Sequence, residues 1–430
     1  MPVPVFPLPH LPRRDKAEVA ISHTIMMLAG MLILALVLRQ VAERRKLPFA
    51  AILVLTGFVG SEVMLLFGLD TGVRHHSFHD LIFYVFLPLL VFEAAFRIDA
   101  LLLRRNLFVV LLLSIPVMLL STTITAVLVY FGINHPTGFP WIAAFLTGAV
   151  LSATDASPIT SRFPKLGVPH RLRVLMEGED LFNDATAIVT FSIFLYIATH
   201  PGEQITFADA AVAFLLVFFG GILIGLLVGL GFLLLSRLFD DPIQQALVCL
   251  ISAYASFLLA DEVLQVSGVM SVLVTGLIMG RVIHNDFQDE RGSFVDNFWS
   301  FNAYVAEALV FLLMGVTVSL GMFEERWLAM LIGILAILIA RAAGIFGTAP
   351  LINLLPWVER VPMAFQQVLF MGSLRGAVVL ALSLSLPVEL PYWWTIQSIA
   401  FGVVIFSLFV QAPLVDPMLR RSSLVDKESS

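Results

Sequence analysis

The sequence predicts an all-α membrane protein whose chain crosses the bilayer about thirteen times. Of the 430 residues, 59% are hydrophobic and 13% are charged, whereas roughly 25% of the residues in a soluble globular protein are charged. The mean hydropathy is +0.96. Apolar runs of about 20 residues, the length that crosses a hydrocarbon core of ~30 Å, recur along the whole chain. This composition argues against a soluble enzyme, and the net charge of −6 gives no sign of a nucleic-acid partner.

The apolar runs define the expected transmembrane segments in chain order. The first group lies at 19–38, 47–67, 80–97, 106–131, 140–161 and 173–199. A single run at 207–236 follows, in which Gly221, Gly225 and Gly229 are spaced for close helix packing. The second group lies at 243–261, 266–281, 297–320, 327–355, 361–386 and 393–416. The connections are short, so we expect one membrane domain over 1–430 that ends in a short cytoplasmic tail at 417–430.

Irregular sequence recurs at matching places in the two groups. The run at 140–161 has a polar centre followed by Pro158, and the run at 361–386 has Gly372, Arg375 and Gly376 in its middle. Helices interrupted by Gly or Pro at corresponding positions indicate inverted repeats with a binding site near the bilayer midplane. We therefore expect 19–199 and 243–416 to be two inverted six-helix repeats, joined by the linking helix at 207–236.

Basic residues in the short loops predict the orientation. If the N-terminus lies outside, most of the 25 Lys and Arg residues fall in cytoplasmic loops and the C-terminal tail. Arg13, Arg14 and Lys16 precede the first run and argue for the opposite orientation. The whole-chain distribution favours an external N-terminus and a cytoplasmic C-terminus. A cleaved signal peptide at 13–38 is an alternative, but no small-x-small cleavage site follows the apolar run.

The most polar segment inside an apolar run is 177–190, EGEDLFNDATAIVT. On a helix, Asp180 and Asp184 stand at i and i+4, and Glu179 and Asn183 form an adjacent pair, so one face is polar. The first acids could simply cap a helical turn, but Asp184 lies too deep for that. An acid at the centre of a membrane helix costs roughly 3 kcal/mol and usually faces a cavity that carries function.

A second polar centre combines Thr154 and Asp155, just before Pro158. Proline lacks a backbone donor and so frees nearby carbonyl groups. Carbonyl, hydroxyl and carboxylate oxygens are the hard ligands that a small monovalent cation needs once it has lost water. A simple proline kink without a ligand is the alternative interpretation.

Two arginines lie inside apolar runs and need compensation. Arg341 stays charged, so a buried acid must neutralise it, and we expect that acid to be Glu179. This pairing would leave Asp184 free to titrate. Arg375 stands at the expected break in its own helix, where it could bind loose carbonyl groups or pair with an acid. Glu93, near the end of its run, fits a cavity-lining acid or an interfacial one.

Five strings give the chain a resemblance to a known family, the monovalent cation/proton antiporters. This family includes NhaP-type bacterial sodium/proton antiporters and animal sodium/proton exchangers. The strings are LPLLVFEAAFRID, GAVLSATDASPIT, GEDLFNDATAIV, LIARAAG and GSLRGAVVLALSLSLP, in the order and spacing of the family. The match covers nearly the whole membrane domain, and the set is specific although each string alone is weak.

The resemblance implies which residues bind the cation. The family's asparagine and aspartate pair matches Asn183 and Asp184, and its threonine and aspartate pair matches Thr154 and Asp155. Asp180 stands where relatives commonly carry a serine that helps to ligate sodium, so this position puts ion choice and charge stoichiometry in doubt.

The resemblance also implies structural roles. The family's ion-paired glutamate and arginine match Glu179 and Arg341, its acid in the third span matches Glu93, and its glycine-rich arginine motif matches Arg375. It implies a homodimer in the bacterial inner membrane, with a scaffold domain, a mobile core domain, and crossed, unwound helices at 140–161 and 361–386.

The residues and the resemblance lead to one expected mechanism. Asp184 binds either a proton or Na⁺, with Li⁺ as a further substrate, and the loaded domain moves across the membrane in alternating access. No cofactor is expected beyond the transported ions. Exchange of K⁺ for H⁺ on the same scaffold is the alternative. A cation channel fits less well, because it would need a continuous filter of carbonyls or rings of acids.

Overall fold

A computed structural model gives the arrangement of the helices. It describes residues 16–45, 48–66, 81–133, 138–202, 205–286, 290–421 and 424. Every regular element within these ranges is helical, as expected for the all-α class. Arg13 and Arg14, on which the opposite orientation depends, lie outside the described residues.

Within the described residues, eight helices are long and apolar enough to cross a membrane. Some of them contain short π-helical stretches, which we label η. Five of them carry a single label: α1 (Lys16–Arg45), α10 (His170–Thr199), α11 (Phe207–Ser236), α14 (Glu290–Thr317) and α15 (Leu320–Asn353). The other three contain a π stretch: α5–η2–α6 (Ala100–Leu112, Leu113–Val117, Met118–Gly132), α12–η3 (Pro242–Leu258, Leu259–Val263) and α18–η4–α19 (Trp393–Phe406, Ser407–Gln411, Ala412–Arg421).

The other helices are shorter. They are α2 (Phe49–Leu66), η1 and α4 (Leu81–Phe86, Leu87–Arg97), α7 (Trp141–Ser152), α8 (Ser157–Thr160), α9 (Phe163–Leu166), α13 (Gly268–Asp286), α16 (Met363–Gly372) and α17 (Ala377–Leu384). Each apolar run identified in the sequence overlaps one of the long or short helices.

Local chemistry explains two features of α5 and η2: the residue at which the helix starts and the change of pitch within it. It starts before the expected boundary at 106 because Asp99 caps it, its Oδ1 accepting hydrogen bonds from the backbone N–H groups of Leu101 and Leu102, both at 3.0 Å. Pro116 lies inside η2. A π turn accommodates the hydrogen bond that proline cannot donate.

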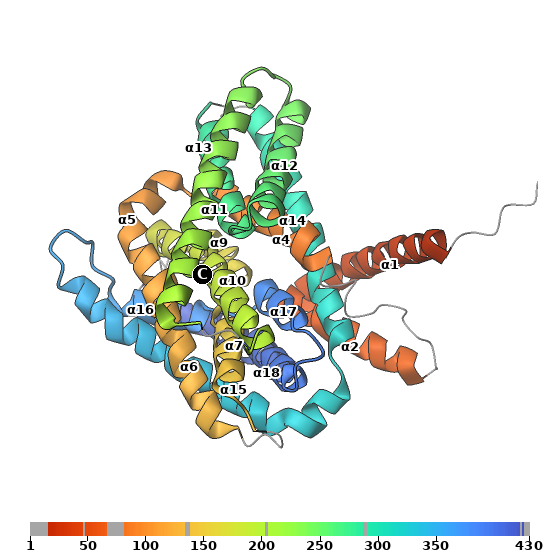
Figure 1. Cartoon of the computed structure of the whole chain (residues 1–430). Helices are drawn as coiled ribbons and strands as arrows, with labels where there is room; N and C mark the ends of the chain where they lie inside the picture. The colour runs from red at the N-terminus through yellow and green to blue at the C-terminus, as the bar shows by residue number, and fades with distance from the viewer. Residues whose placement is uncertain are drawn as a thin grey trace, which may run out of the picture.

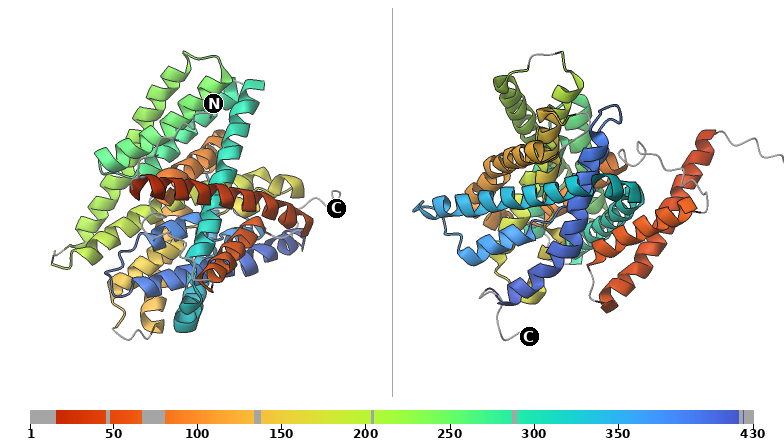
Figure 2. Two further views of the ribbon diagram at one scale, coloured as in Figure 1. Left: turned by 90° about the vertical axis from the view of Figure 1, so that its right-hand side faces the viewer. Right: turned by 90° about the horizontal axis from the view of Figure 1, so that it is seen from below.

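The bundle packs most tightly where helices meet along their length. Helix α2 packs on α14, α11 on α13, α6 on both α7 and α15, and α15 on α18. Figure 1 shows α10 near the centre, with α11, α12 and α13 toward one end of the view and α6, α7, α15 and α18 toward the other. Figure 2 shows α1 and α2 at the edge of the bundle.

The tightest contact of α11 requires glycine. A Cβ at Gly221 would lie 2.4 Å from the carbonyl oxygen of Ser267, just before α13, and a Cβ at Gly225 would lie 2.4 Å from that of Ser271 on α13. The predicted packing role of these two glycines is therefore confirmed.

Two helices are broken where they approach each other. Helix α7 ends at Ser152 and α8 starts at Ser157, while α16 ends at Gly372 and α17 starts at Ala377. The backbone N–H of Asp155 donates to the carbonyl of Leu374 at 2.9 Å, so the two breaks are joined by an isolated antiparallel bridge. The chain leaves the helix before Pro158, whose ring sits in the first turn of α8, so the helix is fully broken here and not merely kinked.

Candidate functional site

The polar face of α10 lies against both breaks. Glu179 and Asn183 are only 2% and 1% exposed, while Asp180 and Asp184 are half-buried. The helical spacing thus places three carboxylates and an amide on one face, beside the places where α7 and α16 lose their helical hydrogen bonds.

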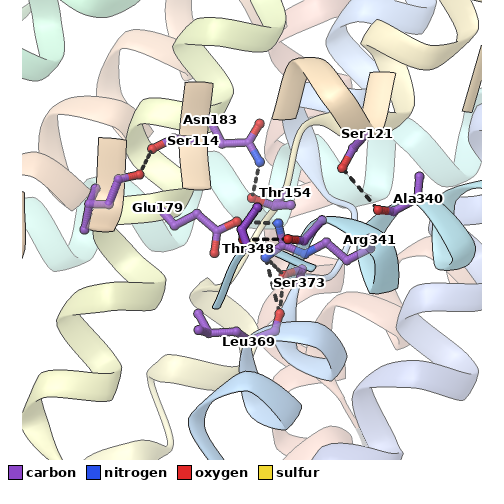
Figure 3. Close-up of polar contacts among 12 residues, drawn as sticks. Ser114, Ser121, Thr154, Glu179, Asn183, Ala340, Arg341, Thr348, Leu369 and Ser373 are labelled. Carbon is purple, nitrogen blue, oxygen red and sulfur yellow. Dashed lines mark hydrogen bonds and ion pairs between the residues drawn. The ribbon is translucent and has the colours of Figure 1, made fainter. Parts of the chain in front are cut away.

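Glu179 and Arg341 form the buried ion pair that the sequence predicts. Glu179 Oε1 contacts Arg341 Nη1, and the two side chains are 3% and 6% exposed. Arg341 Nη2 also donates to the carbonyl of Leu369, at 3.3 Å, and to Ser373 Oγ. Figure 3 shows these contacts joining α10, α15 and the end of α16. The pair satisfies both charges where neither could reach water.

Asn183 joins α10 to the first break. Its Nδ2 donates to Thr154 Oγ1 at 3.1 Å (Figure 3). Thr154 is 5% exposed. Because the amide nitrogen is used in this contact, the amide oxygen of Asn183 is left as a free acceptor in the interior.

Asp155 is held from two sides. Its Oδ1 accepts a hydrogen bond from the backbone N–H of Ser157 at 3.1 Å, and its own N–H is bonded to Leu374. The other carboxylate oxygen lies against Gly376, where an added Cβ would be 1.9 Å away. The glycine therefore leaves the space in which the carboxylate sits.

Arg375 stabilises the break in which it lies. Its Nη1 donates to the carbonyl groups of Ser373 and Leu374, at 2.9 and 3.1 Å. Its backbone is tied to Ser407 Oγ, which accepts from the N–H and donates to the carbonyl, both at 3.2 Å. The sequence left two roles open for Arg375. Its contacts show the first, the binding of loose carbonyl groups. Among the described residues it forms no ion pair with an acid.

Besides Glu179 Oε1, which is ion-paired with Arg341, three buried oxygen atoms at the centre have no hydrogen-bond partner among the described residues. They are Asp180 Oδ1, Asn183 Oδ1 and Asp184 Oδ1. Asp180 and Asp184 are close enough to each other and to Asp155 for their charges to repel. Buried acceptors without donors are costly, and a proton or a cation would satisfy them.

The carboxylates do not form a ready metal cage in this conformation. Within the described ranges, no three acid, His or Cys side chains converge closely enough to hold a metal ion. The cation site expected at Asp184, Asp155, Thr154 and Asp180 would therefore also need hydroxyl, amide and backbone oxygens. Such neutral oxygen ligands are present at both breaks.

Glu93 lies away from these oxygens, in a charged contact between α4 and α14. Its Oε1 pairs with Arg97 Nε at 2.9 Å, and the Glu93 side chain is 17% exposed. Arg97 also donates to the carbonyl of Asp296 at 3.1 Å and to Ser300 Oγ. Glu93 thus has a partner on its own helix, and its role as a cavity-lining or an interfacial acid stays a prediction.

Three contacts of the site were missed by sequence reasoning, although Gly376 was recognised as part of the helix break. Ser373 binds Arg341, Ser407 fixes the backbone of Arg375, and Gly376 makes room for Asp155. The string GSLRG contains two of them and signalled a break. A serine in an apolar helix usually bonds its own backbone, so Ser407 gave no signal.

Comparison with known proteins identifies relatives over nearly the whole chain. The family described as "Sodium/hydrogen exchanger, transmembrane" matches residues 30–421. The Na(+)/H(+) antiporter ApNhaP of Aphanothece halophytica is 35% identical over 384 residues, which are 89% of this chain and 71% of that protein. The low-affinity Na(+)/H(+) antiporter NhaS1 of Synechocystis is 32% identical over 408 residues, or 93% of this chain and 74% of that protein.

A solved structure has the same fold. The sodium proton antiporter MjNhaP1 from Methanocaldococcus jannaschii matches with a TM-score of 0.73 and 19% sequence identity, covering 91% of this chain and 99% of that one. The family match and the relatives above 30% identity together show that this multi-pass membrane protein belongs to the sodium/hydrogen exchanger family, among its NhaP-type antiporters, and is a transporter, not an enzyme.

Proposed function

We propose that this protein is a secondary active antiporter that exchanges Na⁺ or Li⁺ for H⁺, with Asp184 as the shared binding site. The observation that carries the proposal is the set of unpartnered buried oxygens on Asp180, Asn183 and Asp184, next to two broken helices. The named antiport activities of the relatives support the choice of ions.

Competition for one carboxylate would couple the two ions. Asp184 has no ion pair among the described contacts, whereas Glu179 is committed to Arg341. A free carboxylate can hold a proton or a cation, but the two exclude each other. Asp155, Thr154 and Asp180 would complete the cation shell, and Asn183 would orient Thr154 through its hydrogen bond.

For alternating access we propose a pseudo-symmetric architecture of thirteen spans, in which two inverted six-helix repeats place crossed helices at the site. The bridge between Asp155 and Leu374, at the matching breaks of the two halves, supports this assignment. In this arrangement the domain that carries α10 and the breaks would move against a scaffold that includes α2, α4, α13 and α14.

A homodimer and an outside N-terminus complete the proposal. The most apolar stretches of α1 and α11 are only 11% and 17% buried, so these helices offer broad apolar faces to lipid or to a second copy. Basic residues such as Arg97, Arg162 and Arg171 gather at loops that this orientation places in the cytoplasm.

The direct test is ion exchange by purified protein in proteoliposomes. A pH-sensitive dye should report proton movement on addition of Na⁺ or Li⁺, with K⁺ as the comparison. A response to K⁺ that equals the response to Na⁺ would favour potassium/proton exchange. Current without proton movement would indicate a channel.

Replacing Asp184 by Asn should abolish exchange, because the amide can neither release a proton nor neutralise a cation. Asp240→Asn, in the exposed loop after α11, is the matched control and should keep full activity. Both variants should elute as folded protein in size-exclusion chromatography. Residual exchange by Asp184→Asn above about a tenth of the wild-type rate, which corresponds to a loss of less than ~1.4 kcal/mol, would contradict the proposal.

A further inference from the structure

A small cavity lies far along α15 from the ion-exchange site. It has a volume of about 140 Å³ and is lined by the region around Arg326 on α15, by Ile133 after α6 and by Thr395 on α18. These three helices lie together at the lower edge of Figure 1. Arg326 is fifteen residues from Arg341, or roughly 22 Å along the helix, so this cavity is separate from the acids of α10.

Two polar atoms that belong to lining residues are buried and unpartnered. Thr395 is 1% exposed, and its Oγ1 has no hydrogen-bond partner. The side chain of Arg326 is partly exposed, but its Nε atom is buried and has no acceptor among the described residues. In the described part of the chain, Arg326 has no ion pair. A buried N–H without an acceptor is rare in folded proteins. The two unpartnered atoms therefore point to a ligand that would bind between them.

The backbone of α15 is bent to place Arg326 there. Arg326 has φ −127° and ψ 16°, which is not helical, and marks a kink in the second turn of α15. Among the described contacts the preceding residue, Glu325, forms no ion pair with Arg326. Its Oε2 accepts a hydrogen bond from Trp394 Nε1 at 3.2 Å instead. Glu324 is exposed to solvent.

The available groups select an anion. A guanidinium has donors only and a hydroxyl can donate, so together they offer two donors and a positive charge. The N-terminus of α18 adds little, since the N–H groups of Thr395 and Ile396 already bond to the carbonyl of Tyr392. The remaining walls are largely apolar, with Ile133, Ala329 and Ile332 among them, and suit a weakly hydrated ion better than phosphate or sulfate. Glu325 also lines the cavity, and its Oε2 is engaged by Trp394 Nε1.

We propose that this cavity binds a small monovalent anion of the halide class, with Arg326 and Thr395 as its ligands. A water molecule takes about 30 Å³, so the cavity has room for one halide and a few waters. The bound anion would hold together α6, α15 and α18 at the end that the proposed orientation places outside. The binding claim does not depend on the proposed transport function.

The test uses tryptophan fluorescence of the purified full chain, because Trp327 lines the cavity and Trp394 is adjacent to it. Iodide is titrated against gluconate at constant ionic strength. A bound ion gives a saturable quenching component that chloride displaces, whereas collision with exposed tryptophans gives a linear one. We expect the saturable component in the wild type, its loss in Arg326→Gln, and a weakening of at least about threefold in Thr395→Val.

The matched control is Arg105→Gln, an exposed arginine on α5, which should leave the saturable component unchanged. If Arg326→Gln fails to fold, Thr395→Val alone decides. Purely linear quenching of the wild type, or an unchanged saturable component in either folded variant, would overturn the proposal.

Discussion

At the residue scale, two buried arginines are compensated in different ways. Arg341 meets a carboxylate, Glu179, and keeps a full ion pair. Arg375 meets backbone carbonyls that its own helix has released. The difference leaves the acids Asp180 and Asp184 with no arginine partner among the described contacts, which is the condition for binding a transported ion.

Breaking the ion pair should destabilise the protein. Arg341→Ala leaves the Glu179 carboxylate buried without a counter-charge, and such a change typically costs about 3–5 kcal/mol. Thermal unfolding in detergent should show this loss, and Glu179→Gln combined with Arg341→Ala should lose less than the two single variants added together. Strict additivity would show that the pair contributes no coupling. Arg105→Ala serves as the control for loss of an exposed arginine.

Asp180 should tune cation affinity. It lies one turn before Asp184 and close to Asp155, so a cation relieves the repulsion among these carboxylates. Asp180→Ser should keep exchange and weaken apparent Na⁺ affinity by about tenfold, or ~1.4 kcal/mol. Initial rates in proteoliposomes at varied Na⁺ measure this, with Asp240→Asn as the control. An unchanged affinity would remove Asp180 from the ion site.

At the scale of elements, the two breaks support each other. Asp155 of one break bonds to Leu374 of the other, and its carboxylate fills the space left by Gly376. Neither short helix could hold this geometry alone, since α8 has only four residues and α17 has eight. The site therefore depends on the contact between the breaks.

Gly376→Ala should impair ion binding through this contact. The new methyl group would overlap the Asp155 carboxylate, which lies 1.9 Å from the position of the added Cβ. Apparent Na⁺ affinity or maximal rate should fall at least about tenfold, a change of ~1.4 kcal/mol, in protein that still folds. Gly347→Ala in α15, where nothing lies within 4 Å, should behave as wild type. Equal activity of the two variants would contradict this role for Gly376.

The cap of α5 should contribute stability that depends on pH. The backbone N–H of Leu102, together with the His170 ring and the N–H of Leu101, holds the pKa of Asp99 below its ordinary value. A carboxyl group whose pKa is lowered in the folded state stabilises the fold at pH values above its unfolded-state pKa of about 3.9. This stabilisation is lost as the pH falls through the folded-state pKa.

Replacement of the cap tests this effect. Asp99→Ala should therefore cost about 1 kcal/mol at neutral pH, and the difference from wild type should shrink below about pH 4. Melting curves across this range measure it, with Asp240→Ala as the control. A difference that stays constant with pH would show that the charge of Asp99 is not involved.

At the scale of the whole molecule, the helices were predictable because each must present about 20 apolar residues to lipid. The breaks were predictable from Pro158 and Gly376, and the ion pair of Glu179 with Arg341 from charge balance. The bridge from Asp155 to Leu374 was not, because backbone pairing between distant segments leaves no local pattern. The kink at Arg326 also has no sequence signal, since Arg is a good helix former.

The orientation of the chain in the membrane does not follow from local contacts. Labelling of single cysteines from outside the cell should determine it. With Cys249 replaced by Ala, a single cysteine is introduced at Glu389, in the exposed loop before α18, or at Asp240, in the exposed loop after α11. The alternation of spans puts these loops on opposite sides, and the positive charges favour the cytoplasm for Asp240. Glu389→Cys should react with an impermeant maleimide on intact cells, whereas Asp240→Cys should react only after permeabilisation. The reverse pattern would invert the orientation, and equal labelling of both on intact cells would mean that an even number of spans separates them.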